Sequence, residues 1–169
     1  MFDAVKNTVE RVLEWVVILL MAVLAVVVLV GVAWRVAGAA LSWYDEAAGI
    51  LLCWLTFYGA ALAALKRQHI GVPDIVRMLD EGPRKIAFVV AELLVFVFFI
   101  LVAWVGTEVL VILEGTYLVS MPEIPVWVAQ SVIPIGAVLF IIAEALAVPD
   151  AWRRAMPKQS AAHDVAATE

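Results

Sequence analysis

The chain has 169 residues, of which 66% are apolar, and its mean hydropathy is +1.05. This composition leaves no room for a water-soluble domain and indicates a membrane protein. The net charge is −5, but the acidic residues are scattered along the chain, so the charge points to no partner and to no nucleic acid. Cys53 is the only cysteine, which excludes an internal disulfide, a CxxC redox pair and a thiolate metal cluster.

Four long apolar runs predict four transmembrane helices. They cover residues 13–34, 47–65, 86–107 and 125–148, and each has the roughly 17 to 25 residues that a helix needs to cross a bilayer. We therefore predict an all-α membrane protein in which residues 1–156 form a single four-span domain. The third helix can extend towards Leu113, because spanning helices tilt and protrude.

The basic residues predict the orientation of these spans. All but one lie before the first run, between the second and third, or after the fourth: Lys6, Arg11, Lys66, Arg67, Arg77, Arg84, Lys85, Arg153, Arg154 and Lys158. Only Arg35 lies on the other side of the membrane. The positive-inside rule then predicts that both termini and the middle loop are cytoplasmic.

The segment before the first run has a helical pattern of its own. Phe2, Val5, Val9 and Val12 recur at spacings of three and four residues, with polar residues between them. This pattern predicts a short amphipathic helix on the inner membrane surface, or alternatively the beginning of the first spanning helix. The apolar run that follows is too long for a cleaved signal peptide, so we expect it to be retained.

The remaining segments connect or follow the spans. Glycines and prolines divide the middle loop into turns around a short helix expected at residues 74–79. Residues 157–169 have almost no large apolar side chain, which predicts a disordered tail.

Charged residues near the predicted spans are the candidates for function. Glu92 and Glu144 lie inside the third and fourth runs, where we favour interfacial pairing or contact with a partner over a proton relay. Arg35 ends the first span, and Asp45 and Glu46 begin the second after a short connection. An ion pair between Arg35 and one of these carboxylates would clamp the first two helices together.

Other chemistry has no visible carrier in the sequence. His69 lies in the predicted middle loop and His163 in the tail, so neither is placed to ligate a haem within the membrane. No second histidine or cysteine stands at metal-ligand spacing, and no phosphate loop or catalytic triad pattern occurs. We therefore expect no enzymatic activity, no metal and no cofactor.

Several short motifs suggest a family. In chain order they are Trp34-Arg35, Trp43-Tyr44-Asp45-Glu46, Trp54, Gly59-Ala60-Ala61, His69-Ile70-Gly71-Val72-Pro73-Asp74, Ile124-Pro125-Val126-Trp127 and Pro134-Ile135-Gly136. With four spans and this length, the chain resembles the small membrane subunit, the DctQ-type component, of tripartite ATP-independent periplasmic (TRAP) transporters. Pro125 suits the first turn of a helix, whereas Pro134 predicts a kink in the fourth span.

The resemblance implies a transporter of the bacterial inner membrane that is driven by an ion gradient. In that family a large membrane subunit carries the transport sites, and a soluble periplasmic binding protein delivers an organic acid. The small subunit would scaffold the large one within the lipid bilayer and offer outer surface to the binding protein. The residues that we expect to be structural or to lie at a subunit interface are Arg35, Trp43, Asp45, Glu46, Gly59, His69, Asp74, Glu92, Pro125, Trp127 and Pro134.

Two other functions remain open from the sequence. A self-contained homo-oligomeric transporter could carry protons on Glu92 and Glu144. Alternatively, the chain could anchor an enzyme complex in the membrane, although the lack of histidine within the spans weighs against a haem-linked anchor.

Overall fold

The computed structural model describes residues 2–66 and 81–155 and contains four helices that are long and apolar enough to span a membrane. The first three are α1 (Phe2–Val36), α2 (Tyr44–Leu65) and α4 (Glu81–Ile112), and the fourth consists of α5 (Val126–Gln130) followed by α6 (Val132–Ala155). The prediction of an all-α protein with four spans is confirmed. The expected helix at residues 74–79 and the tail lie outside the described residues.

The amphipathic segment at the N-terminus forms the first turns of α1. The helix runs from Phe2 to Val36 without interruption. The apolar residues of the segment continue at helical spacing into the spanning run, and the first glycine of the chain is Gly31. Nothing in the sequence therefore ends a helix between the two parts, and the segment is not a separate surface helix.

The fourth span is interrupted at Ser131, three residues before the proline at which we predicted a kink. Pro134 has no N–H to donate to the carbonyl of Gln130, so an unbroken helix would lose this bond. With the break at Ser131, Pro134 becomes the third residue of α6, where a backbone N–H has no acceptor within the helix. The Ser131 hydroxyl donates to the carbonyl of Val128 at 2.7 Å. At its other end α6 continues through Pro149 to Ala155, beyond the predicted limit of residue 148.

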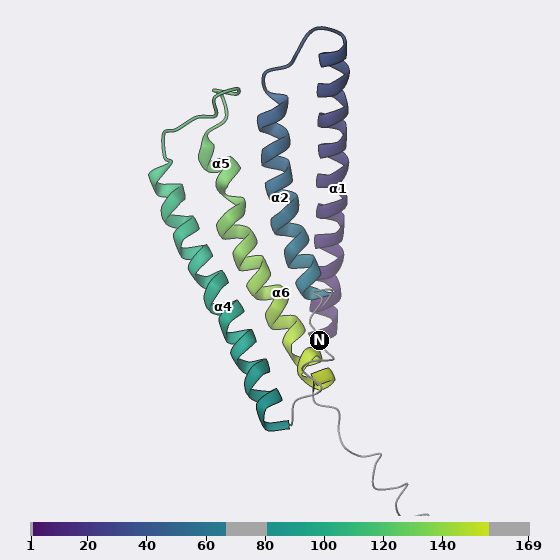
Figure 1. Ribbon diagram of the computed structural model, residues 1–169, viewed down its shortest axis with the longest axis vertical. Helices are drawn as coiled ribbons and strands as arrows, with labels where there is room; N and C mark the ends of the chain where they lie inside the picture. The colour runs from purple at the N-terminus through teal and green to yellow at the C-terminus, as the bar shows by residue number, and fades with distance from the viewer. Residues whose placement is uncertain (1, 67–80, 156–169) are drawn as a thin grey trace, which may run out of the picture.

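The helices lie side by side in the order α1, α2, α6, α4 (Figure 1). The two inner helices pack on each other, and each outer helix packs chiefly on one inner neighbour. The core contains Leu13, Ala61, Ala64, Leu65, Phe140 and Ala143. Its alanines let the helix backbones approach closely, as is common between membrane helices. The ring of Phe99 stacks on that of Phe140 with centroids 3.7 Å apart, which joins α4 to α6.

Three glycines allow a bulky side chain of a neighbouring helix to lie against the backbone. Gly31 of α1 lies beneath the Tyr44 ring, and a Cβ atom there would come within 2.6 Å of the ring's Cγ. In the same way, a Cβ atom at Gly136 would come too close to the side chain of Phe57, and one at Gly106 too close to that of Ile133. These contacts fix the depth at which neighbouring helices meet.

Replacing Gly31 with alanine should destabilise the contact between α1 and α2, because the Tyr44 ring must move away. Overpacking of this kind costs about 1–3 kcal/mol. The measurement is the thermal unfolding midpoint of the purified protein in detergent.

Gly49→Ala is the matched control, because a Cβ at Gly49 meets no atom within 4 Å. Alanine there should be neutral or stabilising, since glycine inside a helix costs roughly 0.5–1 kcal/mol. Equal midpoints for Gly31→Ala and Gly49→Ala would contradict the packing role of Gly31.

Candidate functional site

Polar side-chain contacts between elements gather at the two ends of the helix layer. We call the end at which α1 begins and α2 finishes the basic end. The opposite end, which carries the connections 37–43 and 113–125, is the loop end. Because the helix interiors are apolar, these two regions contain most of the groups that can fix one helix relative to another or recognise a partner.

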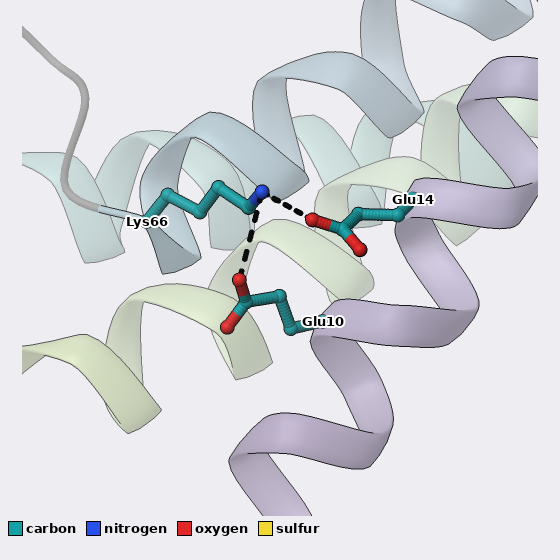
Figure 2. Close-up of polar contacts among 3 residues, drawn as sticks. All are labelled: Glu10, Glu14 and Lys66. Carbon is teal, nitrogen blue, oxygen red and sulfur yellow. Dashed lines mark hydrogen bonds and ion pairs between the residues drawn. The ribbon is translucent and has the colours of Figure 1, made fainter.

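Lys66 joins the first two helices at the basic end (Figure 2). It follows the last residue of α2, and its ammonium donates to Oε1 of Glu14 and lies 3.6 Å from Oε1 of Glu10. Glu10 and Glu14 are four residues apart on one helix and therefore share a face of α1. Without a cation between them, the two carboxylates would repel each other.

A second ion pair extends this cluster to α6. The ammonium of Lys6 donates to Oδ2 of Asp150, so the first turns of α1 contact the last turns of α6. We call Lys6, Glu10, Glu14, Lys66 and Asp150 the basic-end clamp. It holds the start of α1 to two other helices, one of them distant in sequence.

The hydrogen bond from Lys66 to Glu14 raises the pKa of the Lys66 ammonium, and burial opposes this effect only in part. A raised pKa means that the folded protein holds this proton more tightly than the unfolded chain does. The contribution of Lys66 to stability is therefore fully present below its ordinary pKa of about 10.4 and is lost as the pH rises through the raised value.

Replacing Lys66 with methionine should lower the thermal unfolding midpoint, because the apolar stem remains while the cation between Glu10 and Glu14 is lost. In a Glu10→Gln, Glu14→Gln background the same replacement should have a much smaller effect. The difference between wild type and Lys66→Met should persist to about pH 10 and narrow only above it. An equal effect in both backgrounds would show that Lys66 does not act through Glu10 and Glu14.

Glu46 organises the loop end. Its carboxylate lies in the first turn of α2 and accepts the backbone N–H of Ser120 at 2.8 Å and of Val119 at 3.4 Å. Both residues belong to a short hairpin, residues 116–126, which is closed by backbone bonds between Leu118 and Ile124 (3.0 Å) and between Val126 and Thr116 (2.9 Å). Gly115, with φ of +84°, turns the chain into this hairpin. Glu46 thus ties the α4–α5 connection to α2.

The expected ion pair between Arg35 and Asp45 or Glu46 is not formed. The Arg35 guanidinium instead lies 5.6 Å from the centre of the Tyr44 ring, in a cation–π contact. Glu46 is turned towards the amides of the hairpin, and Asp45 is exposed. The two helices are still joined at this point, but through the ring of Tyr44 rather than through a carboxylate.

The other predicted residues are distributed over both ends and the spans. Trp43 caps the start of α2 and Pro125 that of α5, with no side-chain hydrogen bond at either cap. A Cβ at Gly59 would meet no atom within 4 Å, and Trp127 is 46% exposed. Glu92 is half-buried on α4, whereas Glu144 on α6 is only 6% exposed. His69 and Asp74 lie outside the described residues.

Sequence reasoning missed the basic-end clamp and the bond from Glu46 to the hairpin. The spacing of Glu10 and Glu14 was a signal that they share a face, but their partner Lys66 lies far along the chain, 52 residues after Glu14. The sequence also gave no sign that Trp54 donates its indole N–H to the carbonyl of Ala129 at 2.9 Å and so links α2 to α5.

Replacing Glu46 with glutamine should loosen the hairpin, because the backbone N–H groups of Val119 and Ser120 lose a charged acceptor. The measurement is hydrogen exchange followed by mass spectrometry, and the peptide that contains these amides should exchange about tenfold faster. Glu123→Gln is the control, since its side chain is exposed on the same hairpin. Unchanged exchange in Glu46→Gln would contradict the capping role.

The described helices and contacts define a multi-pass membrane protein whose polar groups join helices to one another. Within residues 2–66 and 81–155, no group of three or more histidine, cysteine, aspartate or glutamate side chains could hold a metal ion.

A comparison with known protein families assigns the chain to one of them. The family model for the DctQ component of tripartite ATP-independent periplasmic transporters matches residues 24–154 of the sequence. This match covers most of the chain, so the protein belongs to the DctQ family, a family of transporter components and not of enzymes. No curated protein matches the chain.

Proposed function

We propose that this chain is the small membrane subunit of a TRAP transporter and that it scaffolds a large transport subunit. The large subunit would use an ion gradient to take up an organic acid, which a periplasmic binding protein would deliver. Family membership supports the class of transporter, and the helix arrangement supports the role within it.

The observation that carries the scaffold role is the exposure of the two outer helices. In the most apolar 18-residue window of α4 no residue is buried, and in that of α1 only 6% are. Large side chains such as Leu29 and Trp104 are more than two thirds exposed. A chain that leaves this much apolar surface on both outer helices offers long faces to a larger membrane protein and to lipid.

The contacts between helices fit the same role. Tyr44 over Gly31, Phe57 over Gly136 and the basic-end clamp each fix one helix against another. Such contacts suit a rigid support better than a moving carrier, because alternating access requires one part to shift against another. The hairpin held by Glu46 would then be a fixed surface for the binding protein on the periplasmic side. In this orientation the protein spans the inner membrane, and its basic end and both termini lie on the cytoplasmic side.

The interface residues predicted from the sequence belong to this proposal. Arg35 and Glu46 hold the loop end in shape, and Glu92 lies half-buried on an outer helix, where a partner can reach it. We propose that Arg35 and Glu46 set the subunit geometry indirectly, through Tyr44 and the hairpin. If Arg35→Ala and Glu46→Gln both left assembly and uptake unchanged, this assignment would be wrong.

The main test is to isolate the tagged chain from its native membranes in mild detergent and to identify what accompanies it. We expect a near-stoichiometric, much larger multi-pass membrane protein. The chain alone, reconstituted into proteoliposomes, should support no uptake. Recovery of a homo-oligomer that transports by itself would instead favour the proton-coupled alternative, in which Glu92 and the buried Glu144 become the carriers.

A further inference from the structure

A groove runs along one face of α1 near the basic end. It has a volume of about 480 Å³ and is lined by Asn7, Thr8, Arg11, Val12, Trp15 and Val16. Val12 is 57% and Trp15 68% exposed, whereas Leu13, on the other side of the helix, is only 3% exposed in the core. The groove therefore faces away from the helices that pack on α1.

The lining of the groove changes from polar to apolar along the helix. Asn7, Thr8 and Arg11 come first, and Val12 and Val16 follow towards the middle of the span. The change takes place over a few turns of 5.4 Å each. Trp15 lies at the boundary, where an indole can keep its ring in the apolar region and its N–H near the headgroups. A phospholipid has the same order of groups along the membrane normal.

The charges around the groove favour an anionic occupant. Glu10 and Glu14 are directed towards Lys66, and Lys6 is paired with Asp150. Within residues 2–66 and 81–155, Arg11 makes no ion pair, and the lining of the groove contains no carboxylate. A guanidinium at the membrane surface binds a phosphodiester well, because its planar fork can donate two hydrogen bonds to the phosphate oxygens.

We propose that this groove binds an anionic phospholipid. The phosphodiester lies on Arg11, and an acyl chain lies along Val12, Trp15 and Val16. A zwitterionic lipid would bring its own cation close to Arg11 and would bind less well. An apolar helix of a partner protein would leave the Arg11 charge without a counterion, which is costly once water is excluded.

The first test compares two lipids of identical acyl chains, phosphatidylglycerol and phosphatidylcholine. Each is added to the delipidated full-length chain in detergent, and bound lipid is counted by native mass spectrometry. We expect phosphatidylglycerol to be preferred about fivefold. Arg11→Gln should abolish the preference, and Lys85→Gln, which removes a cation of α4 at the same end but outside the groove, should retain it.

Both variants should keep the circular dichroism of the wild type, since Arg11 and Lys85 are exposed. Equal binding of the two lipids by the wild type, or an unchanged preference in Arg11→Gln, would overturn the proposal. A loss of preference in both variants would overturn it too, because the effect would then come from the general charge of the basic end.

The second test identifies the occupant in native membranes. Val16 is replaced by the photoreactive benzoylphenylalanine, and the chain is irradiated in whole cells. A product heavier by the mass of one anionic phospholipid supports the proposal, whereas a product that carries chiefly a zwitterionic lipid would overturn it. A product joined to another polypeptide would overturn it and would assign the groove to a protein interface. This outcome is independent of whether a large subunit co-purifies with the chain.

Discussion

Helices in a bilayer gain little from burying apolar side chains against one another, because lipid tails are as apolar as leucine. Their association depends on close packing and on a few polar contacts. This constraint governs the whole structure. The alanines of the core bring α2 and α6 together, and Gly31 lets Tyr44 lie against the backbone of α1. The contact at Gly31 needs a small residue opposite a large one, which fixes how α1 and α2 meet.

The same constraint explains where the charged groups lie. A lysine or glutamate in the middle of a span has no water to solvate it, whereas near a helix end it can reach a partner and still contact the headgroup region. Lys66 meets Glu10 and Glu14 at the basic end, and Glu46 meets two backbone amides at the loop end. The polar groups thus add specificity at the two places where the membrane permits them at low cost.

The spanning helices could be predicted from the sequence because length and hydropathy alone define them. The side-chain contacts could not, because they join residues far apart in the chain. Arg35 is an example: the prediction placed it beside an acidic residue of the next helix, but the ring of Tyr44 takes that position while Glu46 serves the hairpin. Pro134 illustrates a partial success. The sequence predicted a kink in the fourth span. The helix instead breaks at Ser131, so that Pro134 lies in the first turn of α6, where a proline costs a helix least.

The ion pair between Lys6 and Asp150 joins residues 144 positions apart, and this separation has a consequence for biogenesis. The hairpin of α1 and α2 can form as soon as its second helix has entered the membrane, because Tyr44, Gly31, Lys66 and Glu14 are then all present. The contact of α1 with α6 must wait until Asp150 and the rest of α6 have been synthesised. The first turns of α1 therefore remain open on that side until α6 has been synthesised and has entered the membrane beside α2.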